Sequence, residues 1–177
     1  MAKLRSASAY RKIKRAYTRT SKYRKKSFIK GIPGNRITMY DQGNLSADFP
    51  CQVDLVVRKE VNLRHNALEA VRVTTSKKLS EVLGKQGFHL KIRAVPHNVI
   101  RENPLATGAG ADRISTGMQL AFGRPISRSA QLKKGKPIIT VYVNPSGLER
   151  AKFALKKASY KIPVACKVVV VKAPQLS

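Results

Sequence analysis

The chain has 177 residues, 42% of them apolar, and carries 36 lysines and arginines against 9 aspartates and glutamates, a formal net charge of +27. This length fits one domain with a core of its own, or one domain plus a tail, and the absence of a signal-peptide core or of an 18-residue apolar run predicts an intracellular protein with no membrane partner. So many positive charges repel one another, and we expect a polyanion to neutralise them. The expected polyanion is nucleic acid.

Residues 1–34 are predicted to form an extended basic arm. Residues 1–40 hold 13 lysines and arginines and no acidic residue, and the pattern has little hydrophobic period up to the turn GIPG at 31–34. Such a segment cannot bury enough apolar surface to order itself alone. Four aromatic residues are interspersed with the charges: Tyr10, Tyr17, Tyr23 and Phe28. Against RNA, such rings can stack on exposed bases or pack on riboses.

Other interpretations of the arm are open at this point. Arg- and Ser-rich, acid-poor N-termini are also typical of mitochondrial transit peptides, but the chain from residue 41 on still carries about +14, which a transit peptide does not explain. A membrane-surface helix needs an apolar face, and residues 1–20 offer little beyond Leu4, Ile13 and some tyrosines and alanines. The simplest alternative is that the arm is a disordered segment that only supplies counter-charge. Nucleic-acid binding accounts for arm and body together.

Residues 36–60 are predicted to form two strands, at 36–40 and 51–60. In the second, strict alternation places four apolar side chains on one face: Cys51, Val53, Leu55 and Val57. Cys51 and Cys166 both stand in alternating apolar segments far apart in the chain. We expect them to be small core residues rather than a disulfide or a metal pair.

Residues 66–84 are predicted to form a helix. Asn66 with Glu69 three positions on makes a start like a capping box, and Gly84 is a suitable stop. Side chains recurring at spacings of three and four define the face expected to lie on a sheet: Leu68, Val71, Thr75, Leu79 and Val82.

Residues 88–95, FHLKIRAV, again alternate like a strand. The side chains expected to point inward are Phe88, Leu90, Ile92 and Ala94. Those expected to point outward are His89, Lys91 and Arg93. The outward cations favour a sheet face that looks at phosphate, although a merely solvated face fits this strand equally well.

The segment RENPLATGAGADRISTGM, residues 101–118, is predicted to be a long loop with charge only at its margins. A glycine-rich phosphate loop feeds a helix N-terminus, whereas the residues that follow are broken by Gly117, Gly123 and Pro125 and contain no GK[ST], so no nucleotide site is predicted. Long loops without secondary structure are usually functional or disordered. Since small residues let a backbone approach another surface closely, we expect that surface to be nucleic acid; a connector with no partner is the alternative.

The C-terminal third is predicted to form strands at 137–143 and 164–171 around a helix within 143–163. Asn144 is the expected cap, with Pro145 at the first helical position and Pro163 beyond the end. The expected core face comprises Leu148, Ala151, Leu155 and Ala158. The last strand, VACKVVVV, is predicted to be too apolar for an edge exposed to water. The whole order predicts an α+β domain of two helices packed on a mostly antiparallel or mixed sheet.

No catalytic residue, metal or cofactor is predicted. His65, His89 and His97 lack metal-ligand spacing, and no nucleophile-elbow pattern occurs. Glu102 and Asp112 bracket the long loop, but two carboxylates at the ends of a loop are a weak basis for acid–base chemistry. We therefore expect a binding protein rather than an enzyme.

Six stretches, in this order, carry a resemblance to a known family: GIPG (31–34), ALEAVR (67–72), GFHLKIR (87–93), HNVIREN (97–103), ATGAGADR (106–113) and TGM…AFG (116–123). Over nearly its whole length the chain resembles the large-subunit ribosomal proteins called L10e in archaea and eukaryotes and L16p in bacteria. The lack of a long C-terminal extension makes the archaeal form the nearer likeness. One departure follows Gly123, where the family usually carries a Gly-Thr pair and this chain reads RPISRSAQ.

The resemblance implies a protein of the cytoplasmic ribosome that binds large-subunit rRNA near the tRNA passage and the peptidyl transferase region, beside neighbouring ribosomal proteins. It also implies a hammerhead-like form of the α+β fold, and a loop at about 102–112 that approaches tRNA and is often mobile without it. An architectural nucleic-acid-binding protein and an RNA-modifying enzyme are the alternatives.

These considerations divide the chain into the arm, 1–34, and a single α+β domain, 35–177. The candidate rRNA-binding residues are Arg5, Tyr10, Arg11, Lys12, Lys14, Arg15, Tyr17, Arg19, Lys22, Tyr23, Arg24, Lys25, Lys26, Lys30, Lys91, Arg93, Arg124 and Arg128. The candidate tRNA-proximal residues are Arg101, Glu102, Asn103, Thr107, Gly108, Gly110, Asp112 and Arg113, with Arg101 and Arg113 as the cationic shoulders of the loop.

Overall fold

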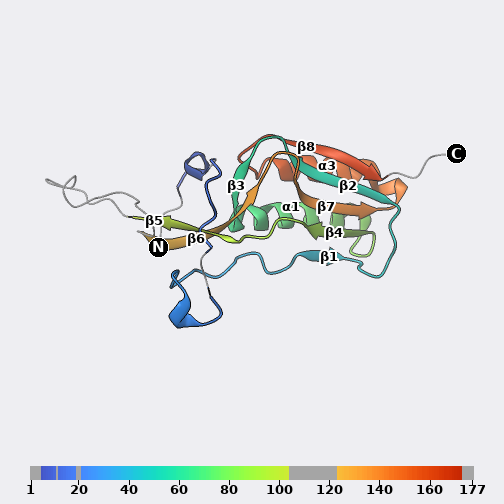
Figure 1. Cartoon of the computed structure of the whole chain (residues 1–177). Helices are drawn as coiled ribbons and strands as arrows, with labels where there is room; N and C mark the ends of the chain where they lie inside the picture. Colours follow the sequence, from blue (N-terminus) through green and yellow to red (C-terminus); the bar gives the residue numbers. More distant parts are fainter. Residues whose placement is uncertain (1–4, 11, 19–20, 104–122, 173–177) are drawn as a thin grey trace.

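The computed structural model describes residues 5–10, 12–18, 21–103 and 123–172, which form two antiparallel sheets (Figure 1). The five-stranded sheet has the order β1 (Asp41–Gly43), β4 (Phe88–Ile92), β7 (Pro137–Val143), β2 (Cys51–Val57) and β8 (Cys166–Lys172). The three-stranded sheet has the order β3 (Val61–Arg64), β6 (Arg124–Leu132) and β5 (Asn98–Glu102). Short 3-10 turns occur at η1 (Ala7–Tyr10), η2 (Arg24–Lys26) and η3 (Pro145–Gly147).

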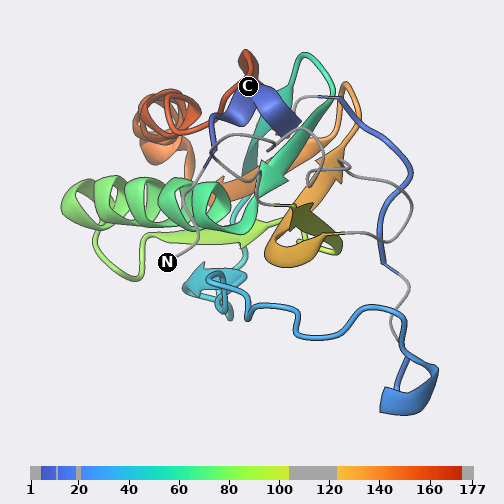
Figure 2. The same ribbon diagram turned by 90° about the vertical axis from the view of Figure 1, so that its left-hand side faces the viewer.

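Helices α1 (His65–Leu83) and α3 (Leu148–Ser159) lie on the same side of the five-stranded sheet (Figure 2). The alternating residues of β2, β7 and β4 that face them are buried, because period-two alternation turns one side of each strand to the helices. Leu79 of α1 and Leu155 of α3 are buried in the same core. The predicted fold class, two helices on an antiparallel sheet, is therefore confirmed.

The predicted core face of α1 is correct except at its C-terminal end. Leu68, Val71, Thr75 and Leu79 are buried, but Val82 is 44% exposed. Spacings of three and four after Leu79 point to positions 82 and 83, and Leu83 is the side chain that packs against the core. Gly84 ends the helix with φ at +72°, in the left-handed region that favours glycine.

The capping-box prediction for α1 is wrong. The helix already begins at His65, directly after β3, so Arg64 occupies the N-cap position and makes no side-chain cap hydrogen bond. Asn66 Oδ1 instead accepts from the Ala67 N–H at 3.0 Å, and the Glu69 carboxylate pairs with Arg72 one turn on.

The second predicted helix begins one turn later than its sequence indicates. Pro145 opens the 3-10 turn η3, in which the Gly147 N–H donates to the Asn144 carbonyl at 2.9 Å, and α3 itself starts at Leu148. Ala151, Leu155 and Ala158 are buried as predicted. Leu148 is half-buried against the same core.

Two strand predictions fail. Residues 36–40 form no strand, although Ile37 is buried, and the pairing with β4 begins only at Asp41. The last strand, β8, is not internal: among the described strands it pairs only with β2 and ends the sheet. Its apolar run packs on the core through one side only, and Val171 is 55% exposed.

Strands β3, β5 and β6 were not predicted, and β5 changes the bounds of the long loop. Arg101 and Glu102, predicted to open that loop, are the last two residues of β5. Glu102 stands opposite Arg124 at the start of β6, so the chain leaves and re-enters this sheet at adjacent positions. Residues 104–122, with most of the predicted loop, lie outside the described residues.

Both cysteines are free, as the sequence predicts. Cys51 is buried in the core, and Cys166 is half-buried at the start of β8, where burial raises the pKa of its thiol to about 11. In the described part of the chain no helix has the length and apolarity to cross a membrane.

Candidate nucleic-acid interface

The first part of the arm, within residues 5–17, lies across the three-stranded sheet. In Figure 1 the N-terminal residues, drawn in blue, are at the end of the molecule formed by β3, β5 and β6. Each strand holds the arm backbone through one amide side chain: Asn62 Nδ2 donates to the Lys12 carbonyl at 2.9 Å, Gln131 Nε2 donates to the Lys14 carbonyl at 2.8 Å, and Asn98 Oδ1 accepts from the Tyr17 N–H at 2.7 Å. The arm is thus attached by its main chain.

These three amides project from one face of the sheet. Asn62 stands opposite Gln131, and Asn98 stands opposite Ser129, which is two residues before Gln131 on β6. The arm also extends the sheet at one point, because the Val99 N–H of β5 donates to the Tyr17 carbonyl at 3.0 Å. Since main-chain groups make these contacts, the charged side chains of the same residues are left to face outward.

Two arginines of the sheet lie over tyrosine rings of the arm. The Arg101 guanidinium is 3.9 Å from the centroid of the Tyr17 ring, and that of Arg64 is 5.7 Å from the centroid of the Tyr10 ring. Arg64 also donates to the Arg5 carbonyl at 2.9 Å. Cation–π contacts of this kind contribute about 0.5–1 kcal/mol each at exposed sites. One face of the Tyr10 ring and one face of the Tyr17 ring are therefore covered by an arginine of the same molecule.

Glu102 adds an electrostatic contact between β5 and the arm. Its carboxylate is 3.6 Å from Arg5 Nε, an exposed pair of small energetic value. Burial, and then the nearby Glu102 carboxylate, raise the pKa of Tyr10 above its usual value, so this phenol remains neutral. Arg101 and Glu102, predicted to approach tRNA, thus both contact the arm in this structure.

The end of the arm is fixed to the body. Arg128 of β6 donates from Nε to the Pro33 carbonyl at 2.9 Å, and Ile29 is buried. The Arg36 N–H donates to Nδ1 of the buried His65 at 3.1 Å. Burial, followed by the nearby guanidinium groups of Arg36 and Arg128, lowers the pKa of His65 and so favours the neutral ring. The hydrogen bond from Arg36 assigns the accepting role in this ring to Nδ1.

Between these attachments the cationic side chains of the arm are exposed. Five of them, here called the arm cluster, are Lys12, Lys14, Arg15, Lys25 and Lys26. Arg5, Lys22 and Lys30 are exposed as well, and Tyr23 is 63% exposed, with Lys26 Nζ 5.4 Å from its ring centroid. Among the described residues of the arm, the only ion pair is that of Arg5 with Glu102, so most of the cations are not neutralised within the molecule. This is the electrostatic character of a phosphate-binding surface.

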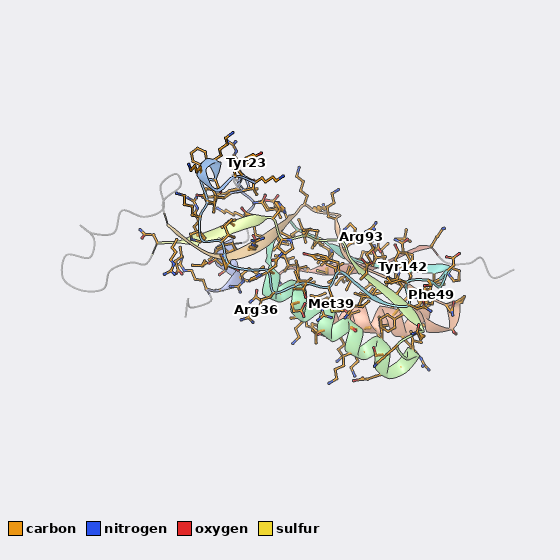
Figure 3. All side chains as sticks on the ribbon, turned by 90° about the horizontal axis from the view of Figure 1, so that it is seen from below. Tyr23, Arg36, Met39, Phe49, Arg93 and Tyr142 are labelled. Atoms are coloured by element: carbon orange, nitrogen blue, oxygen red, sulfur yellow. The ribbon has the colours of Figure 1, made fainter. Side chains whose placement is uncertain are left out.

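The predicted cations of the body lie in different places. Lys91 and Arg93 are on the side of the five-stranded sheet that faces away from the helices, where Figure 3 shows Arg93 with Tyr142 and Phe49. Lys91 Nζ is 3.8 Å from an Asp41 oxygen that also lies 3.0 Å from His89 Nε2, whereas Arg93 is exposed. Arg124 is exposed at the start of β6.

Several predicted residues cannot be placed. Arg11, Arg19, Thr107, Gly108, Gly110, Asp112 and Arg113 lie outside the described residues, and only the backbone of Arg24 is described. Asn103 directly follows β5. In the described ranges no three His, Cys, Asp or Glu residues gather as ligands for a metal ion.

Asn62, Asn98 and Gln131 were not predicted as site residues, although they position the arm. The sequence contains only a weak signal for them. In a stretch such as VNLR at 61–64, polar and apolar residues alternate, and the amide occupies one of the polar positions. Its partner, however, is a main-chain group up to 117 positions away, which no local pattern indicates.

Comparison with known proteins supplies the remaining observation. Residues 18–169 match the family model described as Ribosomal protein L16p/L10e. The chain is 46% identical over 170 residues to the "Large ribosomal subunit protein uL16" of Archaeoglobus fulgidus, covering 96% of this chain and 94% of that protein. It is 45% identical over 174 residues to the protein of the same name from Methanococcus maripaludis strain S2 (98% and 97%) and 42% identical over 169 residues to that from Methanoculleus marisnigri (95% and 96%).

Proposed function

Because this chain belongs to the ribosomal protein L16p/L10e family, and so is a structural constituent of the large ribosomal subunit rather than an enzyme, we propose that its arm and the three-stranded sheet beneath it bind large-subunit rRNA. Membership of the family gives the place of the protein, the ribosome, and its association with rRNA and other ribosomal proteins. The surface that makes the RNA contacts is the subject of the proposal.

One observation carries this proposal: the arm is held by its main chain. Asn62, Gln131 and Asn98 bond to backbone atoms of residues 12–17, and the lysines and arginines between those atoms stay exposed. A cationic segment fixed in this way loses less conformational freedom on binding than a free tail does. The sheet therefore acts as a support that presents a row of cations to phosphates.

Releasing the arm from this support should weaken RNA binding without removing any charge. In the triple variant Asn62→Ala, Gln131→Ala, Asn98→Ala, we expect the affinity for a large-subunit rRNA fragment to fall by roughly tenfold to a hundredfold. Three hydrogen bonds of about 1 kcal/mol each no longer order the arm, and their sum sets the upper end of this range. Trypsin should also cleave at Lys12 and Lys14 faster than in the unmodified chain.

A matched control is the triple variant Asn44→Ala, Gln86→Ala, Asn144→Ala, which removes three amides that make no hydrogen bond to the described residues of the arm. It should retain both RNA affinity and protease resistance. Unchanged affinity in the first variant, with faster cleavage of the arm, would show that the support does not contribute to RNA binding.

The second part of the proposal concerns tRNA. We propose that the segment of about 102–112 approaches tRNA on the assembled ribosome. Gly108 and Gly110, without bulky neighbours, allow a backbone to follow another backbone closely but not to specify a base sequence. This segment belongs to the longer stretch that leaves β5 at Glu102 and enters β6 at Arg124, two residues that stand opposite each other in the sheet. Arg113 remains the proposed shoulder, whereas Arg101 lies on Tyr17.

Removing residues 104–111 and joining the ends with a short Gly-Ser bridge tests this division of roles. The shortened protein should bind rRNA and enter the subunit normally, because the arm and its support are intact. We expect tRNA affinity on the assembled ribosome, translation rate or release of assembly factors to decline. Normal translation and tRNA binding would make the segment a linker only, and failure to enter the subunit would make it part of the rRNA-binding surface.

A further inference from the structure

The free edge of the five-stranded sheet has an unusual composition. Strand β8 runs along the upper rim of the molecule in Figure 1 and, within the described residues, is bonded to β2 alone. It reads CKVVVVK, four consecutive valines bounded by Lys167 and Lys172. Exposed edges of natural sheets are usually shortened, bulged or carry charges along their length, since an apolar edge adds further strands. In β8 the register shifts only near the C-terminal end, between Val170 and Lys172, and the run of four valines leaves an apolar edge that calls for a partner.

The register shows which backbone groups point away from β2. The Arg58 N–H donates to the Ala165 carbonyl at 3.0 Å, and the pairing then proceeds through Val56 with Lys167 and Asp54 with Val169. Because hydrogen-bonded and non-hydrogen-bonded pairs alternate in an antiparallel ladder, Lys167 and Val169 turn their N–H and C=O groups to β2. Those of Cys166, Val168 and Val170 are directed to the open edge.

An apolar groove accompanies this edge. It has a volume of about 520 Å³ and lies between β8 and α3, with Leu55 at its floor and Val168, Val170 and the 54%-exposed Phe153 at its sides. A strand added to β8 would turn every second side chain toward this groove. Outward backbone groups with an adjacent apolar groove are the two elements of peptide recognition by strand addition.

The rim of the edge is cationic on both sides. A second hollow of about 480 Å³ lies against Val169 on the other face of the sheet. The cations that line the two hollows are Arg58, Lys59, Lys134, Lys152, Lys156 and Lys167. Glu149 is the one carboxylate among the described lining residues, and it pairs with Lys152 at 2.7 Å. An incoming segment with acidic side chains would complement this charge.

We propose that β8 is a docking edge for an extended, acidic segment of a neighbouring protein, which adds to the sheet as a sixth strand and places alternate apolar side chains between β8 and α3. A second copy of this chain would bring Lys167 and Lys172 against their like charges in a molecule of net charge +27. The phosphates of RNA could bind the cations at this edge. RNA, however, has no regular row of N–H and C=O groups that would pair with the backbone of β8. The proposal does not depend on the RNA contacts of the arm.

The test uses the full chain and a fluorescein-labelled peptide in which valine and glutamate alternate. We expect saturable binding by fluorescence anisotropy, and a loss of about tenfold or more in Val168→Pro, which removes an outward N–H and obstructs the edge. Proline is tolerated on an edge strand when its nitrogen faces outward, so the ladder with β2 is kept. Val168→Ala is the matched control, since it shortens the side chain but retains the N–H, and it should bind more tightly than Val168→Pro. Equal thermal midpoints of the two variants would confirm that both are folded.

Two further peptides separate strand addition from simple charge attraction. A peptide of the same composition with its valines and glutamates in separate blocks, and one with lysine in place of glutamate, should both bind at least several-fold more weakly. Equal binding of the block peptide, or equal binding by Val168→Pro and Val168→Ala, would overturn the proposal. So would weaker binding of an rRNA fragment by Val168→Pro, which would make RNA the occupant, or a dimer of the unmodified chain in sedimentation equilibrium that Val168→Pro abolishes.

Discussion

Neutralising the arm cluster by substitution of its five residues with glutamine should weaken binding to a large-subunit rRNA fragment by roughly 10³-fold near 0.1 M salt. Each cation that neutralises a phosphate releases condensed counterions, and five such contacts contribute roughly 3.5–4.5 to the slope of log affinity against log salt concentration. The free energy of unfolding should be unchanged, because the substituted side chains are exposed and the arm is held through main-chain carbonyls. Filter binding at several salt concentrations measures both the affinity and the slope.

A control with the same loss of charge is available on the helical side of the molecule. The helix cluster comprises Lys77, Lys85, Arg150, Lys156 and Lys157, all of them exposed. Its substitution by glutamine lowers the net charge equally and should change the slope by less than about one unit, since the effect of distant charges is screened beyond a Debye length of about 10 Å. Equal effects of the two sets of substitutions would mean that RNA senses only the total charge, and that the arm is no defined interface.

Leu79→Ala should destabilise the protein by roughly 2–5 kcal/mol, the usual cost of removing a buried leucine side chain and leaving a cavity. Leu79 lies in the core with 1% of its surface exposed, on the face of α1 that packs in the main core. Urea unfolding followed by circular dichroism gives the value. Since the described hydrogen bonds of residues 5–17 of the arm with the body are to β3, β5 and β6, RNA affinity under conditions where the variant is folded should match that of the unmodified chain.

Val82→Ala is the corresponding control on the same helix. Val82 was predicted to lie on the core face, but it is 44% exposed, so its truncation should cost no more than about 0.5 kcal/mol. A large loss of stability in Val82→Ala, together with a small one in Leu79→Ala, would show that α1 is rotated about its axis relative to the structure described above.

The elements predicted correctly are those whose own residues decide their structure. Strand β4 alternates strictly between buried and half-buried positions, β2 and β7 carry apolar residues at every second position, and α1 and α3 repeat at the helical period. Each of these patterns indicates both the element and one buried face. The family resemblance correctly added the identity of the protein, which composition alone could not have supplied.

The elements that were missed depend on partners distant in the chain. The sequence of β6, RPISRSAQL, contains two arginines, two serines and a proline and looks like a loop, yet it is the central strand of its sheet because β3 and β5 pair with its two edges. The edge position of β8 is likewise a property of the sheet and not of the strand. The contact of Arg101 with Tyr17 was also not predicted, because the two residues are distant in the chain and meet only in the folded structure.

The main-chain attachment of the arm has a consequence for how this sequence can change over time. Asn62 and Gln131 bond to carbonyl oxygens and Asn98 to an N–H, groups that every residue except proline supplies in full, so the attachment does not depend on which side chains stand at positions 12, 14 and 17. Lysine and arginine can replace each other in the arm, and a charge can move by one position, without loss of these hydrogen bonds. Replacement of Asn62, Asn98 or Gln131, in contrast, removes the amide group that makes the bond. Comparison of many relatives should therefore find substitutions concentrated in the segment that carries the charge, and the least variation in three uncharged residues of the body.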